Sequence, residues 1–192
     1  MSRSKIIQIL STLSKGEMKS LGDFVQSPFF NSSKVMVRFY QALKKLYPEF
    51  DEKMMDKKKI FGQIHEGKKF NKQVYKNDSS EFLGLLRQFL LQLALQNDKD
   101  IQARLMLNQY NRRFLDALFN SALEIHKNEL DQKYNVDDVY FEKKFYLENE
   151  IIQFGLSRNK QNEISLNVVN RTSYQILHLY LWLLKSLSEI KT

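Results

Sequence analysis

The fold of this chain is decided by residues 13–50, LSKGEMKSLGDFVQSPFFNSSKVMVRFYQALKKLYPEF. Near the start of this segment, Ser14 and Glu17 have the spacing of a capping box, in which each side chain bonds a backbone amide at the beginning of a helix. Further on, Pro28 ends that helix, because proline has no amide proton and disfavours helical geometry in the residue before it. Both signals predict helical structure that begins and ends at defined positions.

A second helix follows in the same segment. Residues 31–33, Asn-Ser-Ser, offer its N-cap, and Pro48 ends it. The pattern therefore predicts two amphipathic helices hinged at Ser27-Pro28-Phe29-Phe30-Asn31. We expect Phe29 and Phe30 to pack into this corner as part of the core.

The composition extends the helical prediction to the whole chain. Its 192 residues include only 2 Pro and 6 Gly, too few for the turns of a β-rich fold. A short helix is expected at residues 56–65, with Ile60, Phe61 and Ile64 buried. Apolar residues at helical spacing follow in two further stretches: Phe82, Leu85, Leu86, Phe89, Leu90 and Leu93, and then Ile101, Leu105, Leu107, Phe114, Leu118, Ala122 and Ile125.

These patterns predict an all-α protein. Residues 1–97 are expected to form a basic helical module, and residues 98–192 an array of antiparallel helical hairpins, similar to a tetratricopeptide superhelix. The two parts can also form one continuous array.

The last helix, expected at about residues 163–189, is apolar on nearly all sides. A helix of this kind needs packing partners on several sides. Such a helix either lies at the centre of the domain or packs on a neighbour outside it. We expect the second arrangement, in which the chain is the N-terminal part of a longer protein whose later helices cover this one, or forms oligomers. Tyr180, Trp182 and Leu183 are the candidate interface residues.

The positive charge is concentrated in the first part of the chain. Residues 1–77 contain 16 Lys or Arg and 7 Asp or Glu, whereas residues 78–192 contain 14 and 15. Such a surplus indicates either a solvated lysine-rich surface or contact with an anionic partner such as nucleic acid. The candidate residues for an anionic partner are Arg38, Lys44, Lys45, Lys57, Lys58, Lys59, Lys68, Lys69 and Lys72.

Two apparent ligand loops fail at key positions. Residues 62–69 follow the spacing of a phosphate-binding loop, but Lys69 stands where a hydroxyl must bind magnesium. Residues 131–142 place oxygen donors as in a calcium loop, but Lys133 occupies a ligand position and Val136 the position of the turn glycine. Ordinary helix ends and connections account for both stretches.

No residues suggest catalysis. Helical metal sites need paired ligands on one face, and His65, His126 and His178 are scattered singly. There is no cysteine, which suits a reducing cytoplasm and excludes disulfides and thiolate chemistry. No apolar run has the length of a membrane span. We expect a non-enzymatic, cytoplasmic protein without cofactor or metal and without membrane contact.

One stretch carries a family resemblance. The pattern L-S-x-x-E-x-K-x-L-x-x-F-V-x-S-P-F-F-N at residues 13–31, with the basic helix that ends at Tyr47-Pro48, resembles the start of a family of uncharacterised all-helical proteins from Bacteroidetes-type bacteria. Phe70-Asn71, residues 82–93 and residues 140–148 resemble later parts of that pattern. The resemblance implies a helical fold and a longer protein, and it brings no activity, cofactor or site residue.

The function expected from the sequence is that of a helical scaffold or adaptor that binds a protein or peptide partner, since stacked helix pairs form extended surfaces. The alternative is a nucleic-acid-binding protein that acts through the basic N-terminal module. Salt dependence separates the two, because phosphate contacts release counterions.

Overall fold

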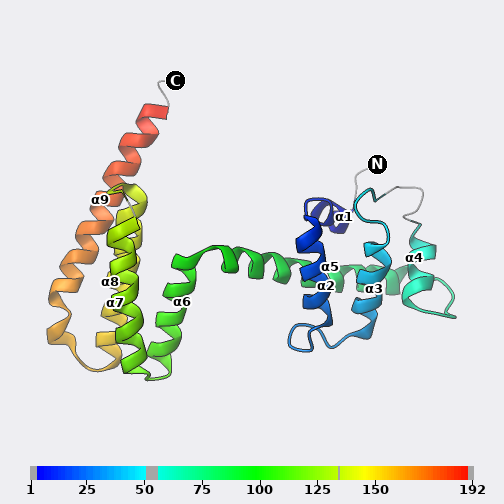
Figure 1. Ribbon diagram of the computed structural model, residues 1–192, viewed down its shortest axis with the longest axis horizontal. Coiled ribbons are helices and arrows are strands. Elements are labelled where there is room, and N and C mark those ends of the chain that lie inside the picture. The colour runs from blue at the N-terminus through cyan, green and yellow to red at the C-terminus, as the bar shows by residue number, and fades with distance from the viewer. Residues whose placement is uncertain (1–3, 51–55, 134, 190–192) are drawn as a thin grey trace. The chain divides into compact units, whose positions relative to one another are not determined.

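The computed structural model describes residues 4–50, 56–133 and 135–189. These residues form nine α-helices and one short 3-10 helix, and no strand occurs among them (Figure 1). The predicted all-α class is confirmed. The chain divides into two compact units, unit 1 up to Ala94 and unit 2 from Leu95. The boundary predicted after residue 97 falls at the end of a helix that begins in unit 1.

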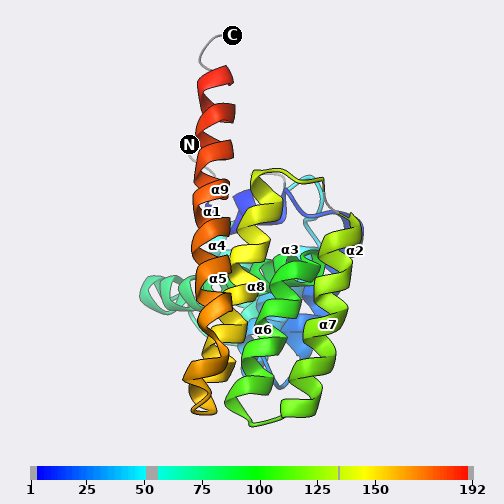
Figure 2. The ribbon, with the colours of Figure 1, turned by 90° about the vertical axis from the view of Figure 1, so that its left-hand side faces the viewer.

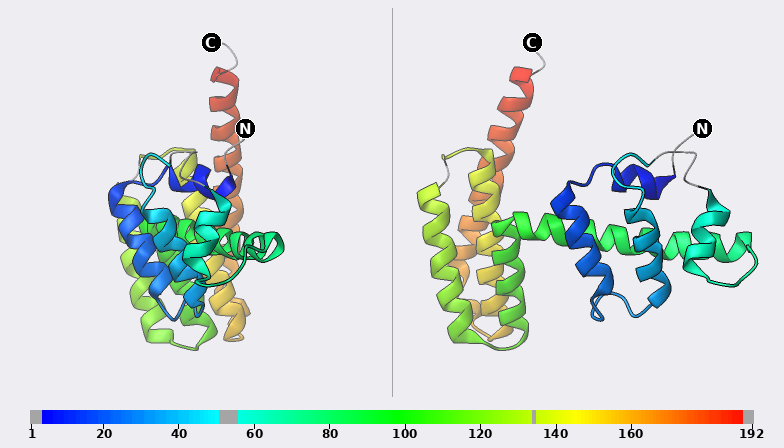
Figure 3. Two further views of the ribbon diagram at one scale, coloured as in Figure 1. Left: turned by 90° about the vertical axis from the view of Figure 1, so that its right-hand side faces the viewer. Right: turned by 45° about the vertical axis from the view of Figure 1, so that its right-hand side comes forward.

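The helices described in unit 1 are α1 (Lys5–Leu10), α2 (Lys15–Gln26), α3 (Lys34–Lys44), α4 (Lys57–Ile64) and α5 (Lys72–Asn97), whose last three residues belong to unit 2. Figure 3 shows the antiparallel pair α2 and α3 lying across the longer α5. The predicted capping box starts α2, because the Glu17 amide donates to Ser14 Oγ at 3.2 Å and the Ser14 amide donates to Glu17 Oε2 at 2.8 Å.

The corner between α2 and α3 is held by Asn31. Its side-chain amide donates to the carbonyl oxygens of Val25 (2.7 Å) and Ser33 (3.1 Å), and its Oδ1 accepts from the Ser33 amide at 2.9 Å. Phe30 stacks on Phe24 with ring centroids 4.2 Å apart, as a core residue at the corner should. The expectation for Phe29 is wrong, since 88% of its surface is exposed. Only one of two adjacent side chains in this turn can face inward.

The core of unit 1 follows the helical periodicity closely. Ile60, Phe61 and Ile64 of α4 are buried as predicted. In α5 the first four residues of the predicted stripe are buried. The next one, Leu90, is 37% exposed. Fully buried side chains from the other helices complete this core: Leu10, Leu21, Val25, Met36 and Phe39.

Unit 2 consists of α6 (Lys99–Arg112), α7 (Asp116–Lys133), α8 (Asp138–Ser157), the 3-10 helix η1 (Gln161–Glu163) and α9 (Ser165–Glu189). Successive helices run antiparallel, so that α6 and α7 form one hairpin and α8 and α9 the next (Figure 1). The last helix begins at Ser165, two residues after the expected start at about residue 163, because η1 occupies residues 161–163.

The core of unit 2 differs from the predicted pattern. Of the expected stripe, Leu107 is buried, whereas Phe114 is 70% exposed and Ile125 60% exposed. Phe114 has a positive φ of 58° and lies in the turn between α6 and α7. The core cluster consists of Leu107 together with Phe119, Leu123, Leu130 and Leu147, and Phe119 stacks on Phe154 with ring centroids 4.1 Å apart.

Candidate functional site

The exposed apolar surface of α9 is the most unusual feature of unit 2. No residue of this 25-residue helix is buried. Soluble proteins rarely leave a continuous apolar surface of this extent uncovered unless it meets a partner. Its exposed large apolar residues are Leu166, Val168, Val169, Ile176, Leu177, Leu179, Tyr180, Trp182, Leu183, Leu184 and Leu187.

Six positions of α9 form a seam with alternating spacings of four and three residues. We call this set the α9 seam: Val169, Ser173, Ile176, Tyr180, Leu183 and Leu187. Its five apolar members are between 52% and 60% exposed, and Ser173 is exposed as well. This 4-3 spacing is that of the a and d positions of a heptad, which keep one stripe of a helix facing another helix.

The opposite side of α9 packs on α8. Arg171 Nη1 donates to Asn149 Oδ1 at 3.4 Å, His178 Nδ1 lies 2.8 Å from the Asp138 carbonyl oxygen, and Lys185 Nζ lies 3.7 Å from Asp138 Oδ1. The three α9 residues are seven positions apart and occupy the heptad position farthest from the seam. These contacts fix the rotation of α9 and leave the seam facing away from α8.

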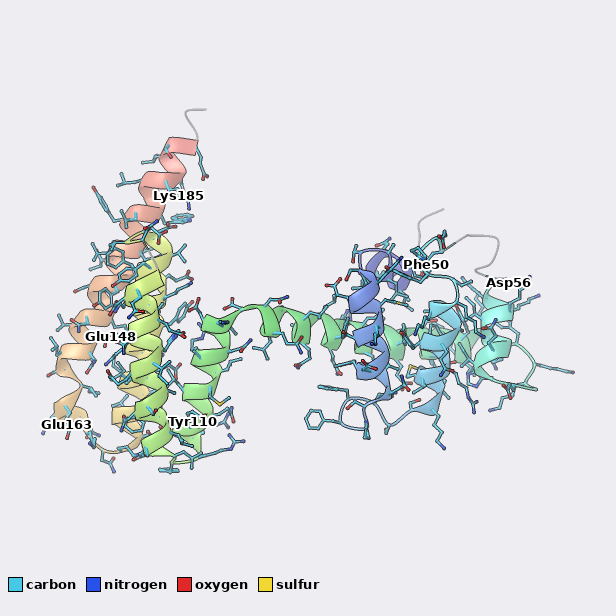
Figure 4. The ribbon with its side chains drawn as sticks, in the orientation of Figure 1. Phe50, Asp56, Tyr110, Glu148, Glu163 and Lys185 are labelled. Atoms are coloured by element: carbon cyan, nitrogen blue, oxygen red, sulfur yellow. The ribbon has the colours of Figure 1, made fainter. Side chains whose placement is uncertain are left out.

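The C-terminal part of α9 extends past the end of α8. His178 is level with Asp138, the first residue of α8, and α9 continues for eleven more residues, about 16 Å of helix. Figures 2 and 3 show this part standing clear of α7 and α8, and Figure 4 labels Lys185 on it. Tyr180 and Leu183, two of the predicted interface residues, lie on the α9 seam. Trp182, the third, is half exposed and lies outside the seam and the positions that flank it.

A second feature of unit 2 is a cavity of about 310 Å³ between α6, α7 and α8. Apolar and titratable side chains share its lining: Ile101, Leu107, Tyr146 and Leu147 with Asp98, Asp100, Arg104, His126, Glu142, Lys143 and Glu150. The α8 members lie at positions 142, 143, 146, 147 and 150, on one face of the helix. This cavity was not predicted from the sequence, although the spacing of Leu147 and Glu150 places them on one helix face.

Two buried titratable groups face this cavity. Burial raises the pKa of Glu150, and the Arg104 guanidinium opposes that rise. The Arg104 guanidinium also lies over the Tyr146 ring, 4.3 Å from its centroid. His126 is 7% exposed, and burial lowers the pKa of its imidazole, so it is neutral at pH 7.

The basic residues predicted to bind an anionic partner lie in unit 1, in several different settings. Arg38 Nη1 donates to the Ile64 carbonyl oxygen at 3.3 Å and so supports the end of α4. Lys44 Nζ lies 5.8 Å from the centre of the Tyr40 ring, and Lys45 follows as the C-cap of α3. The other six are exposed, in the first turn of α4, in the loop after α4, and at the start of α5: Lys57, Lys58, Lys59, Lys68, Lys69 and Lys72.

The structure brings three of these lysines together. Lys57 and Lys58 of α4 and Lys72 of α5 line one surface hollow of unit 1. Phe70 and Tyr75 contribute aromatic rings to the same lining, and Lys76 contributes a fourth lysine. Lys59, Lys68 and Lys69 are not part of this lining.

The residues of the rejected motifs have structural contacts. His65 Nε2 lies 2.8 Å from Asp78 Oδ2. Asp131, the first residue of the calcium-like stretch, pairs with Lys144 Nζ at 2.5 Å and accepts from Tyr140 Oη at 3.1 Å. Tyr134 of that stretch lies outside the described residues. Gly67 has a φ of 73° and lies in the turn region after α4.

In the part of the chain that the structure describes, no three His, Asp or Glu side chains are grouped as a metal site would require. The helices described there also lack the combination of length and apolar character that crossing a membrane requires. Comparisons with protein-family models, with curated proteins and with solved structures found no match to this chain.

Proposed function

We propose that the protein is a non-enzymatic helical scaffold that binds a protein partner through the α9 seam, and that the partner is a second copy of the chain. The observation that carries this proposal is the heptad spacing of exposed apolar residues on the side of α9 that faces away from α8. Such a stripe is recognised by another helix that packs along it with knobs in holes.

The helix that carries the binding surface is already formed in a single chain, before any partner binds. In proteins most of the stability of a helix comes from packing one of its faces against the rest of the fold. Here α9 is held on α8 by Arg171, His178 and Lys185. Binding of a partner helix therefore buries the apolar side chains of the seam, and none of the binding free energy is needed to fold α9.

The seam is suited to pairing with itself. When two copies of α9 run antiparallel about a two-fold axis near residue 178, Val169 meets Leu187, Ser173 meets Leu183 and Ile176 meets Tyr180. Each layer then joins an a position to a d position, and the small Ser173 faces a large leucine. A two-fold interface of this kind uses the same patch on both chains.

Charge does not oppose this pairing. Within residues 165–189 the charged side chains are Arg171, Lys185 and Glu189, and none of them is on the seam or at the positions flanking it. Those flanking positions are Asn170, Thr172, Leu177, Leu179, Leu184 and Ser186. Flanking charges commonly set partner choice in helix pairs, so their absence leaves no repulsion between identical chains.

Pairing would place two copies of unit 1 in one particle, which raises its avidity for any partner that both copies contact. The test is the mass of the purified chain in solution, measured by light scattering over a hundredfold range of concentration. We expect a mass of about twice 22.9 kDa at the upper end. A mass of one chain throughout the range overturns the proposal.

A second candidate function is nucleic-acid binding by unit 1. It is favoured by the hollow in which Lys57, Lys58, Lys72 and Lys76 lie beside Phe70 and Tyr75, because single strands bind where basic side chains accompany stacking aromatics. Titration with a labelled oligonucleotide tests it. A log–log slope of affinity against salt near zero, or no binding at physiological salt, excludes this function.

A further inference from the structure

The cavity between α6, α7 and α8 holds a carboxylate oxygen without a partner. Glu150 is 8% exposed, and its Oε2 is buried with no hydrogen-bond partner among the residues that the structure describes. Leaving a buried polar group unpaired in this way destabilises the folded state. An unpaired polar group of this kind in a native fold calls for an explanation, and a bound molecule that donates to it is one.

Several other polar groups of the lining already have partners. Asp98 Oδ1 accepts from the Ile101 amide at 2.9 Å, and Asp100 Oδ2 accepts from Lys143 Nζ at 2.6 Å. The Arg104 guanidinium is held over the Tyr146 ring. Among the lining residues that the structure describes, Glu150 carries the buried side-chain oxygen that lacks a partner, so it is the group that a ligand would complete.

Charge and shape define the class of ligand. The lining has four carboxyl groups against two cationic side chains, while His126 is neutral at pH 7, so a cation is favoured over an anion. A volume of about 310 Å³ is at the lower end of small-molecule pockets. Ile101, Leu107 and Leu147 offer apolar surface, and a bare metal ion would lack the additional oxygen ligands it requires.

We propose that this cavity binds a small organic cation, a molecule with a primary ammonium or guanidinium group on a short apolar body, with Glu150 as its anionic partner. The cationic group donates to Glu150 Oε2, and the apolar body packs between α6 and α8. This site is separate from the α9 seam and does not depend on self-association.

The pH dependence of this binding has a definite sign. Burial raises the pKa of Glu150, and only the ionised carboxylate attracts a cation. Affinity therefore falls as the pH decreases through that raised pKa. The other charged or titratable groups that face the cavity are Asp98, Asp100, Arg104, His126, Glu142 and Lys143, and protonation of His126 at low pH acts in the same direction.

The test uses the full chain and four probes of similar size: n-butylammonium, n-butylguanidinium, neutral n-butanol and anionic butyrate. Each is titrated while the backbone amide resonances of α6, α7 and α8 are followed by NMR. We expect the two cations to shift resonances around His126 and Glu150 with saturation. We expect butanol and butyrate to leave them unchanged at the same concentrations.

Glu150→Gln removes the charge with little change of shape, and it should weaken cation binding by about ten- to a hundredfold, as loss of a hydrogen bond to a charged group does. Glu124→Gln removes a charge from exposed α7 surface outside the cavity and should leave the affinity unchanged. Saturable binding of butyrate, absence of any shift with the cations, or equal affinity in Glu150→Gln each overturns the proposal. Circular dichroism of both variants confirms that they are folded.

Discussion

His178 of α9 donates from Nδ1 to the carbonyl oxygen of Asp138, the first residue of α8, at 2.8 Å. The bond joins two helices 40 positions apart in sequence at the point where α8 begins. It sets both the rotation and the height of α9 on α8. For this reason Tyr180 and Leu183, only a few residues further on, point away from the rest of unit 2 and remain exposed.

The close approach of Gly22 to Tyr40 leads to a prediction about stability. A β-carbon at Gly22 would lie 2.7 Å from Tyr40 Oη, which donates to the Met18 carbonyl oxygen at 2.8 Å. Gly22→Ala should therefore destabilise unit 1, by about 1–3 kcal/mol as overpacking does. The measurement is urea unfolding followed by circular dichroism.

Gly84 provides the matched control for that substitution. It lies inside α5, and a β-carbon there meets no atom within 4 Å among the described residues. Gly84→Ala should stabilise the protein by roughly 0.5–1 kcal/mol, because alanine loses less backbone entropy in a helix. Equal effects of the two substitutions would show that Tyr40 does not press on Gly22.

Asn31→Asp tests the corner between α2 and α3. The substitution keeps the shape but removes the amide that donates to the carbonyl oxygens of Val25 and Ser33, and it places a carboxylate against them. We expect a loss of about 1–3 kcal/mol in the free energy of unfolding at pH 7, and part of it should return at a pH low enough to protonate the aspartate. A neutral effect at pH 7 would mean that Asn31 does not hold the corner.

Arg158 and Asp116 make a pH-dependent contact in unit 2. Arg158 Nε donates to Asp116 Oδ1 at 3.0 Å, and this hydrogen bond lowers the pKa of Asp116 from its ordinary value of 3.8. Because the folded pKa is lowered, the stabilisation is complete above the ordinary carboxylate pKa and is lost as the pH falls through the lowered value. In Arg158→Gln the pKa of Asp116, followed by carboxyl NMR, should rise toward 3.8. An unchanged titration would contradict the pairing.

The helices of unit 1 could be predicted from local chemistry. The Ser14 and Glu17 capping box and the helix-stopping Pro28 act within a few residues, and the structure has both where the sequence placed them. The stripe of α5 was predicted because its apolar residues lie on one face. These signals do not depend on the rest of the fold, so they can be read from the sequence.

Features that depend on tertiary packing could not be predicted in the same way. In α7 apolar residues lie on more than one face, so periodicity did not show that Phe119 would be buried while Ile125 remained exposed. Phe29 and Phe30 are adjacent and chemically identical, and only the path of the turn decides which one enters the core. In the sequence Glu150 is one of many acidic residues, and its burial depends on how α6 and α7 pack against α8.

The apolar character of the last helix was clear from the sequence, but its orientation was not. The heptad seam becomes evident only after His178 and Lys185 are seen to occupy the opposite side against α8. The suggested membership of a bacterial helical family and the tetratricopeptide-like superhelix stay predictions.

The central claim, that the α9 seam pairs with a second copy, is tested most directly by comparing Ile176→Glu with Gln175→Glu. The two neighbours receive the same charge, but only Ile176 is on the seam. Both chains carry the change, so Ile176→Glu removes two apolar side chains from the interface. The free energy of association should become less favourable by about 3–6 kcal/mol, which weakens association by about two to four orders of magnitude.

Sedimentation equilibrium of the two variants and the parent chain gives the answer. We predict that Gln175→Glu associates as the parent chain does, and that Ile176→Glu sediments with the mass of one chain at the same concentrations. Equal association of both variants, or a parent chain that is already monomeric, would contradict the account.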